Sequence, residues 1–261
     1  MFIVAGLPCS MRINGIITRK NGENLPPADT SNIVSPIYQL AGNLDVNDFE
    51  QSGDDDFSFA IPGLSRFRVS AYKQRGALSV VIRIISFSLP NPTEIGIPQR
   101  IIDFSNFSKG LVLVTGTAGS GKSTTLACII DAINHHYRKH IITLEDPLEF
   151  LHRHDLSIVS QREINVDTES YVTALRVSLR QSPDVILLGE MRDYETMQVA
   201  MTAAETGHLI FSTLHTIGAA STIDRIIDVF PPNQQHQIAV QLSMVLQAVI
   251  SQQLTAACTD D

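Results

Sequence analysis

The hydrophobic positions follow two different patterns along the chain. In the N-terminal part they alternate with polar positions, as in "RFRVSAY", where Phe67, Val69 and Ala71 fall on one face. This alternation predicts a β-strand with one buried face, and "ALSVVIRII", which follows the turn-like "KQRG", predicts its hairpin partner. A second hairpin is expected at Asn14-Gly15 in "MRINGIITR", because both residues tolerate positive φ. The N-terminal part is therefore expected to be mainly β.

After Lys109 the pattern changes to continuous apolar runs separated by helical segments. The runs "LVLVT", "HIITLE", "DVILLG" and "HLIFSTL" predict strands. Helices are expected to begin near Lys122, Ser170, Asp193, Ala219 and Asn233. Apolar strands that alternate with helices predict a parallel sheet buried on both faces. The final helix is expected to span 235–254, where Ile238, Leu242, Val245, Val249 and Ile250 lie near helical spacing.

The two patterns predict two domains joined by a linker. The stretch "LPNPTEIGIPQR" contains three prolines and marks the linker. We expect an N-terminal domain over 1–87, a linker over 88–109, a parallel-sheet domain over 110–254 and a disordered tail over 255–261. The acidic segment "EQSGDDDF" is expected to be solvated.

Composition narrows the classes of protein that fit. Of the 261 residues, 44% are hydrophobic, which indicates a globular fold. The net charge of −8 argues against a general nucleic-acid-binding surface. Cys9, Cys128 and Cys258 have no metal-ligand or redox spacing, which predicts reduced thiols in a cytosolic protein. No apolar run reaches about eighteen residues, so no transmembrane helix is predicted. The histidine-rich "HHYRKH" and "FLHRHD" are expected to be exposed rather than metal-binding.

A glycine-rich motif stands between a predicted strand and a predicted helix, in "GLVLVTGTAGSGKSTTLACII". This context is the one that a phosphate-binding loop requires, because its amides and the helix N-terminus face the phosphates. Lys122 would contact the β- and γ-phosphates of ATP, and the Ser123 hydroxyl would bind Mg²⁺. The predicted nucleotide-binding residues are Gly116, Thr117, Ala118, Gly119, Ser120, Gly121, Lys122, Ser123 and Thr124.

Acidic and histidine residues follow three of the predicted strands. Glu190 ends "DVILLGE", and Glu145 ends "HIITLE". Because the carboxyl ends of parallel strands line the ligand crevice, both acids are expected near the γ-phosphate. His208 and His215 flank the strand "LIFSTL". Phosphoryl transfer requires a carboxylate that orients the attacking water or holds the metal, and either acid fits that role.

Together these segments resemble the secretion ATPase superfamily, which includes type II secretion and type IV pilus motors. "LRQSPDVILLGEMRD" is similar to its Walker B signature, "TLEDPLEF" to its Asp box and "AAETGHLIFSTLHT" to its His box. "GLSRFRVSAYKQRG", "SQREINVDT" and "TIDRIIDVFP" are similar to the PilT-type pilus retraction ATPases within it. The resemblance covers residues from about 5 to 254.

The resemblance implies an α/β chain that forms a hexameric ring. Its RecA-like P-loop ATPase domain, with a parallel sheet, is preceded by a smaller α+β, PAS-like N-terminal domain. Such a ring acts at the cytoplasmic face of the inner membrane, on the platform protein of the pilus. Carried over by motif, Glu190 is the Walker B acid that holds Mg²⁺ through water, and Glu145 is the water-activating acid. His215 is the γ-phosphate sensor and His208 a second His-box residue. Position alone leaves open which acid is the base.

The resemblance also gives two arginines a role. Arg68 and Arg83, in "RFRVS" and "VVIRII", match arginines that reach the nucleotide, within one subunit or across the ring. The final segment "SQQLTAACTDD" stands where the family continues through a further helical region. A nucleotide-binding regulatory paralogue without retraction activity is therefore one alternative to a working motor. A RecA-like nucleic-acid translocase is the other, and the acidic composition argues against it.

Overall fold

The computed structural model describes residues 1–13, 15–42, 44–85 and 88–255. Within it the chain divides into two compact units, Met1–Ser86 and Phe87–Asp261. The tail that was predicted to be disordered lies, from residue 256 onward, outside the described residues. Among the described residues, no helix is both long and apolar enough to cross a membrane.

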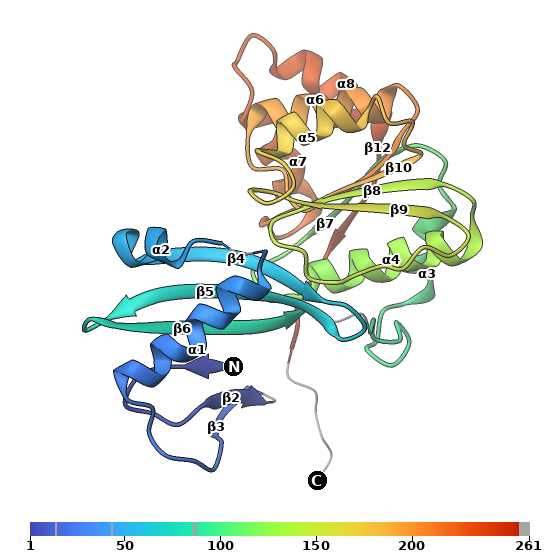
Figure 1. The fold of residues 1–261 in the computed structure, drawn as a ribbon. Coiled ribbons are helices and arrows are strands. Elements are labelled where there is room, and N and C mark those ends of the chain that lie inside the picture. Colours follow the sequence, from blue (N-terminus) through green and yellow to red (C-terminus); the bar gives the residue numbers. More distant parts are fainter. Residues whose placement is uncertain (14, 43, 86–87, 256–261) are drawn as a thin grey trace. The chain divides into compact units, whose positions relative to one another are not determined.

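The N-terminal unit is an antiparallel sheet with two helices (Figure 1). The strand order is β3-β2-β1-β6-β5-β4. The helices are α1 (Pro27–Leu40) and α2 (Val46–Ser52). The strands are β1 (Phe2–Ile3), β2 (Ser10–Ile13), β3 (Ile16–Arg19), β4 (Asp54–Ile61), β5 (Ser65–Gln74) and β6 (Ala77–Ile85).

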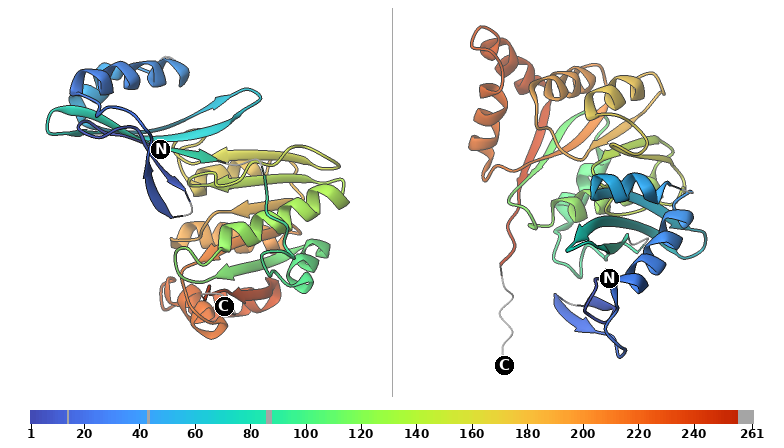
Figure 2. Two further views of the ribbon diagram at one scale, coloured as in Figure 1. Left: turned by 90° about the horizontal axis from the view of Figure 1, so that it is seen from below. Right: turned by 60° about the vertical axis from the view of Figure 1, so that its left-hand side comes forward.

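Both predicted hairpins form in this unit. Strands β2 and β3 pair through Ile13 and Ile16, and β5 pairs with β6 from Arg66 to Gln74. The alternation along β5 buries Val69 and Ala71, which pack in one core with residues of α1. Figure 2 shows α1 lying along this sheet. The expected α+β character of the unit therefore arises from one buried sheet face that a helix covers.

The acidic segment of the N-terminal unit is largely exposed, as expected. It is also regular structure, because it ends α2 and begins strand β4 at the edge of the sheet. Alternation reconciles the two properties, because Asp54 and Asp56 are exposed while Phe57 and Phe59 are buried in the core. An edge strand tolerates this charge because one side of its backbone stays open to water.

The C-terminal unit contains a six-stranded sheet in the order β12-β7-β11-β10-β8-β9. Every neighbouring pair is parallel. The strands are β7 (Gly110–Thr115), β8 (His140–Glu145), β9 (Ile158–Glu163), β10 (Val185–Leu188), β11 (Leu209–Leu214) and β12 (Leu246–Ser251). The four apolar runs that predicted strands are β7, β8, β10 and β11, and they form the interior of the sheet.

Helices cover both faces of this sheet (Figure 1). One face carries α3 (Gln99–Ile102), the 3-10 helix η1 (Asp103–Asn106) and α4 (Lys122–His136). The other face carries α5 (Tyr171–Ser178), α6 (Tyr194–Glu205), α7 (Ala219–Asp228) and α8 (Gln235–Val245). Successive strand residues point to opposite faces, so Ile141 packs with the α4 layer and Ile142 with the α6 layer. This double burial explains why the strands are continuously apolar.

The end of the chain differs from the expected single helix over 235–254. Helix α8 ends at Val245, and the next six residues form strand β12, which pairs with the edge of β7. Val249 then packs with one helix layer and Ile250 with the other, as adjacent strand residues do. The segment 88–109, which was expected to be a linker, contains α3 and η1, and Ile102 is buried beside α4.

The parallel topology sets where a site can form. The carboxyl ends of β7, β8, β10, β11 and β12 all lie at one edge of the sheet. The glycine-rich motif follows β7, while Glu145 ends β8 and His215 follows β11 directly. Residues far apart in sequence therefore meet at this edge.

Candidate functional site

The glycine-rich motif forms a loop between β7 and α4. Gly121 caps the helix in a left-handed conformation, with φ 87° and no side-chain hydrogen bond to the first turn. No side chain caps the amide groups at the start of α4. The positive end of the helix dipole lies at the loop, because the helix begins where the loop ends. These two features make the loop a site for an anion.

Lys122 is the cation of this loop, and it is buried with 8% of its surface exposed. Its Nζ donates hydrogen bonds to the carbonyl oxygens of Gly116 at 3.0 Å and Thr117 at 2.9 Å. Burial lowers the pKa of Lys122, whereas the negative charges of Glu149 and Glu190 act in the opposite direction. The ammonium group is held by neutral carbonyls, which an anionic ligand can replace.

Glu190 faces the loop from the end of β10 and is also buried, with 8% exposed. Its Oε1 lies 2.5 Å from Nη2 of Arg192, and its Oε2 lies 3.4 Å from Nε2 of His215. Among the described residues, no group hydrogen-bonds to Oε2. The hydrogen bond to Glu190 raises the pKa of Arg192. Glu190 is thus a buried carboxylate with one oxygen paired and the other still able to accept a hydrogen bond.

Glu145, at the end of β8, has a different environment. Burial raises the pKa of Glu145 to about 7, and the negative charge of Glu149 acts in the same direction. The neighbouring Thr143 and Gln161 side chains oppose this rise. Near neutral pH the Glu145 carboxyl group therefore exists in both protonation states, which suits a group that exchanges protons.

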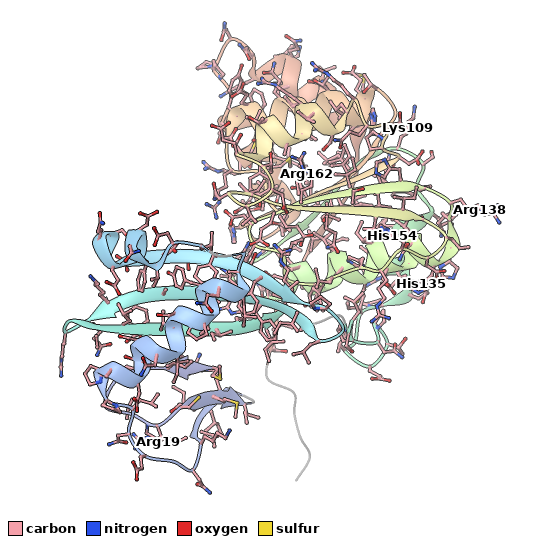
Figure 3. The ribbon with its side chains drawn as sticks, viewed as in Figure 1. Arg19, Lys109, His135, Arg138, His154 and Arg162 are labelled. Atoms are coloured by element: carbon pink, nitrogen blue, oxygen red, sulfur yellow. The ribbon has the colours of Figure 1, made fainter. Side chains whose placement is uncertain are left out.

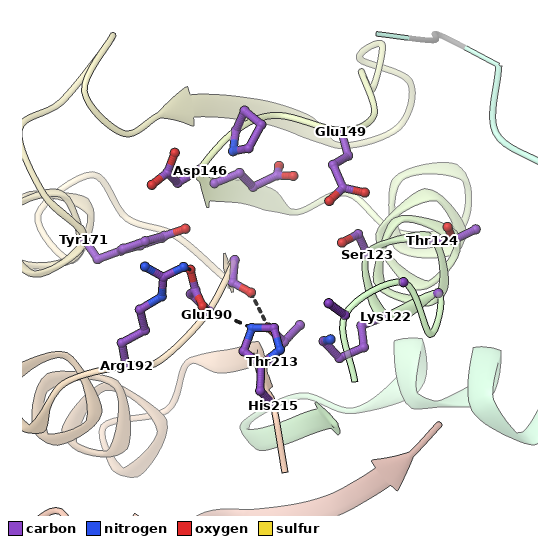
Figure 4. A pocket seen from close by; sticks show the side chains of 16 residues that line it. Lys122, Ser123, Thr124, Asp146, Glu149, Tyr171, Glu190, Arg192, Thr213 and His215 are labelled. Carbon is purple, nitrogen blue, oxygen red and sulfur yellow. Dashed lines mark hydrogen bonds and ion pairs between the residues drawn. The ribbon is translucent and has the colours of Figure 1, made fainter. Parts of the chain in front are cut away.

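These groups surround one cavity of about 440 Å³ (Figure 4). Burial, together with the charges of Glu190, Asp146 and Glu145, raises the pKa of Tyr171, so its phenol stays neutral. The lining is Ala118, Gly119, Gly121, Lys122, Ser123, Thr124, Glu145, Asp146, Pro147, Glu149, Tyr171, Gly189, Glu190, Arg192, Thr213 and His215. The site therefore combines an anion-binding loop with four carboxylates, a phenol, a guanidinium and an imidazole.

The structure brings most of the predicted site residues together. Six residues of the phosphate loop, both strand-end acids and His215 line the cavity. His208 does not line it, because it precedes β11 whereas His215 follows it. The six residues of β11 stand between the two histidines, so seven residue steps at roughly 3.3 Å each separate them by about 23 Å. Nδ1 of His208 instead lies 3.0 Å from the carbonyl oxygen of Ala203.

Arg68 and Arg83 belong to the N-terminal unit, where they are register partners on β5 and β6. Nη2 of Arg68 lies 3.9 Å from a carboxylate oxygen of Asp56. The described residues that line the cavity all belong to the C-terminal unit. The role of the two arginines at the nucleotide stays a prediction.

The histidine-rich segments run from the end of α4 to the start of β8 and along the segment before β9 (Figure 3), and none of their residues lines the cavity. The expected exposure is wrong for His152, whose side chain is 2% exposed. The two nitrogen atoms of His135 lie 3.3 Å from Asp131 and 3.5 Å from Asp155. Nδ1 of His154 accepts a hydrogen bond from the amide of Val159 at 3.0 Å. Among the described residues, no group of three or more potential ligands has an arrangement that could hold a metal ion.

Besides Asp146 and Glu149, which lie close to Glu145 in the sequence, three polar residues of the cavity had no role assigned from the sequence. Arg192 lies two positions after Glu190, so its place beside that acid could have been predicted from the strand end. Tyr171 begins α5 and Thr213 lies inside β11, where its hydroxyl donates to the carbonyl of Gly189 at 2.6 Å. No local motif marks either residue, and only the packing of α5 and β11 brings them to the cavity.

Comparison with known proteins places the chain among secretion and pilus ATPases. The model of the family "Type II/IV secretion system protein" matches residues 8–261. The type IV pilus retraction ATPase PilT of Pseudomonas aeruginosa is 46% identical, over 97% of this chain and 73% of its own length. The twitching motility protein of Neisseria gonorrhoeae is 43% identical, over 94% of this chain and 64% of its own length. The chain thus spans about two thirds to three quarters of these relatives.

Solved structures show the same fold. The crystal structure of the pilus retraction motor PilT with bound ADP has a TM-score of 0.88 and 44% identity, covering 95% of this chain and 72% of its own. The ATPase DotB of Legionella pneumophila has a TM-score of 0.79 and 28% identity, covering 94% of this chain and 69% of its own. The expected fold class, that of the PilT and secretion ATPases, is thereby confirmed.

Proposed function

Because the chain belongs to the type II/IV secretion system protein family, we propose that it is an ATP-hydrolysing motor subunit of a type IV pilus retraction system. One observation carries the proposal: the phosphate loop, both strand-end acids and His215 line a single cavity. The high identity to pilus retraction ATPases supports the same role. The reaction is hydrolysis of ATP to ADP and phosphate.

ATP binds through the loop and the first turn of α4. The phosphates accept hydrogen bonds from the amide groups at the start of the helix, which lack a side-chain cap. Lys122 exchanges its hydrogen bonds to the Gly116 and Thr117 carbonyls for contacts with the β- and γ-phosphates. The crystal structure of a pilus retraction motor with bound ADP supports a nucleotide as the ligand.

The residues present also fit a Mg²⁺ ion that accompanies the nucleotide. Four carboxylates, Glu145, Asp146, Glu149 and Glu190, face one lysine and one arginine in the cavity. Oε2 of Glu190 is buried and accepts no hydrogen bond from the described residues. The Ser123 hydroxyl and Glu190, through water, would hold the ion. When bound, Mg²⁺ neutralises phosphate charge.

Hydrolysis requires a group that orients and deprotonates water. We assign this role to Glu145, because a pKa of about 7 lets its carboxylate accept a proton near neutral pH. Glu190 is already paired with Arg192, which suits a metal-holding carboxylate better than a base. His215, whose side chain is 56% exposed beside Glu190, can donate to the γ-phosphate as its sensor.

The proposed assembly is a homohexameric ring at the cytoplasmic face of the inner membrane. Its partner there is the platform protein of the pilus. Arg68 and Arg83 act on the nucleotide as arginine fingers, which stabilise charge that develops on the γ-phosphate. The support for this assembly is membership of the family and the high identity to pilus retraction ATPases.

The test separates nucleotide binding from hydrolysis. Glu145→Gln and Glu190→Gln each keep the side-chain shape and remove an acid. We expect both variants to bind ATP with near wild-type affinity in calorimetry and to lose about a hundredfold in phosphate release. Glu169→Gln, an exposed acid outside the cavity, is the matched control. Wild-type turnover in both cavity variants would refute the proposed chemistry.

A further inference from the structure

Gln252, the residue directly after β12, contacts the phosphate loop at both of its ends. Its backbone amide donates a hydrogen bond to the carbonyl of Thr115, the last residue of β7, at 2.8 Å. Its side-chain Oε1 accepts a hydrogen bond from the Thr125 hydroxyl, in the first turn of α4, at 2.9 Å. Gln252 does not line the nucleotide cavity. It therefore holds the loop from outside the site.

Two glycines of the loop lie against Gln252. A Cβ atom on Gly116 would overlap the carbonyl oxygen of Gln252. A Cβ atom on Gly121 would lie 2.9 Å from Nε2 of Gln252, which is closer than side chains pack. Both glycines also have positive φ, 148° and 87°. The glycines thus serve the approach of Gln252 as well as the turn of the loop.

In the middle of the loop, the Thr117 carbonyl accepts hydrogen bonds from Lys122 Nζ and from the Ser120 amide. Thr117, Ala118 and Gly119 are exposed, while the buried Ser120 hydroxyl has no hydrogen-bond partner among the described residues. A loop with flexible glycines loses conformational entropy when it binds phosphate. Contacts that fix both ends of the loop reduce this cost before the ligand arrives.

We infer that Gln252 is a positioning residue of the phosphate loop, which sets the spacing between the end of β7 and the first turn of α4 through its contacts with Thr115 and Thr125. The inference rests on the proposed nucleotide-binding function. Its neighbour Ser251 supports the same strand end, because the Ser251 Oγ accepts a hydrogen bond from the amide of Gly218 at 3.0 Å. The end of β12 is therefore tied both to the phosphate loop and to the segment after His215.

A role in stability alone makes a different prediction from a role in positioning. Gln247 provides the comparison, since it is also a glutamine of β12 and its side chain also lies against a glycine, Gly110, at the opposite end of β7. Gln247→Ala removes packing at that remote end. Loss of stability without a change in nucleotide affinity is the result expected of Gln247→Ala.

The experiment measures ADP affinity by calorimetry, with thermal unfolding as the check on folding. Gln252→Met keeps the side-chain volume and removes the acceptor, and Thr125→Val removes the donor. We expect each to weaken ADP binding by about fivefold to twentyfold, since one hydrogen bond to a buried group is worth roughly fivefold and misplacement of the loop adds to it. Thr125→Ser keeps the hydroxyl group and should bind like the wild type.

The double variant makes the test specific. Because both substitutions break the same hydrogen bond, Gln252→Met with Thr125→Val should weaken ADP binding no more than the stronger single change. Folded Gln252→Met and Thr125→Val proteins with wild-type ADP affinity would overturn the inference, as would effects that multiply. If Lys122→Ala abolishes binding while these variants keep it, only the inference fails. If the wild type binds no ADP, the proposed function fails with it.

Discussion

Glu145 and Glu190 are both carboxylates at the ends of parallel strands, but their partners differ. Oε1 of Glu190 forms an ion pair with Nη2 of Arg192 at 2.5 Å. Glu145 is enclosed beside Glu149, and the pKa of Glu145 is raised to about 7. The two acids occupy equivalent positions in the sequence, and the difference in their surroundings supports the proton-accepting role proposed for Glu145.

The raised pKa of Glu145 predicts a pH-dependent cost to stability. Its pKa is about 7 in the folded protein and 4.5 in its ordinary state. The folded state therefore binds more protons between these values, and its stability falls as pH rises from about 4.5 to 7. Above that range the ionised, buried carboxylate keeps the protein less stable.

Glu145→Gln should remove this cost. We expect the variant to gain stability over the wild type by about 2 kcal/mol more at pH 8 than at pH 5. Denaturant unfolding at the two pH values measures the difference. The exposed acid control, Glu169→Gln, should show no such pH dependence. An equal effect of Glu145→Gln at both pH values would contradict the raised pKa.

In the parallel sheet, the interior strands could be predicted from sequence and the edge strands β9 and β12 could not. Strands β7, β8, β10 and β11 are largely apolar on both faces, and this pattern predicts buried strands. The apolar spacing of the segment "LQAVIS" is compatible with a helix or a strand. Pairing with β7 makes this segment the strand β12. Strands β4 and β9 were missed for a similar reason, because an edge strand carries polar residues.

The same limit applies to the site. The loop motif and the strand-end acids were predictable because parallel strands end at one edge of the sheet. The separation of His208 from His215 could also be predicted from the sequence, because the six residues between them form a predicted strand. Tyr171 and Gln252 were not predictable, because α5 and β12 reach the site only through tertiary packing.

The strand at the end of the chain makes its own prediction. Val249 and Ile250 are adjacent but pack with opposite helix layers. Each of Val249→Ala and Ile250→Ala should therefore cost about 1 kcal/mol of unfolding free energy, in separate cores. Val240→Ala, on the exposed side of α8, should cost little. Urea unfolding checks this, and a neutral result at either Val249 or Ile250 would contradict the strand assignment.

For the whole molecule, the proposed ring gives the N-terminal unit a part in catalysis. Arg68 and Arg83 lie opposite one another on β5 and β6, so one surface of the N-terminal sheet carries two guanidinium groups. Among the described residues, the carboxylate partner of Arg68 is Asp56, at 3.9 Å. An arginine of this kind is free to contact another group without first breaking a short ion pair.

If these arginines are fingers, their loss should slow hydrolysis without weakening binding. We expect Arg68→Ala and Arg83→Ala to keep ATP affinity and to lose up to about a thousandfold in turnover. Arg19→Ala, an exposed arginine of the same unit on β3, is the matched control.

Mixing the variants then shows whether a finger acts across subunits. An arginine variant mixed with Lys122→Ala should recover some activity, because some neighbouring pairs then join an intact arginine to an intact phosphate loop. Lost turnover without recovery would favour fingers within one subunit. Unchanged turnover in both arginine variants would show that Arg68 and Arg83 are ordinary surface charges.

The central claim is that the cavity at the carboxyl edge of the sheet binds ATP through Lys122, and calorimetric titration with ATP tests it most directly. Lys122→Ala removes the cation that contacts the phosphates, whereas Lys109→Ala removes an exposed lysine at the opposite end of β7. We predict that wild type and Lys109→Ala bind ATP alike and that Lys122→Ala shows no measurable binding. ATP affinity of Lys122→Ala equal to that of the wild type would contradict the claim.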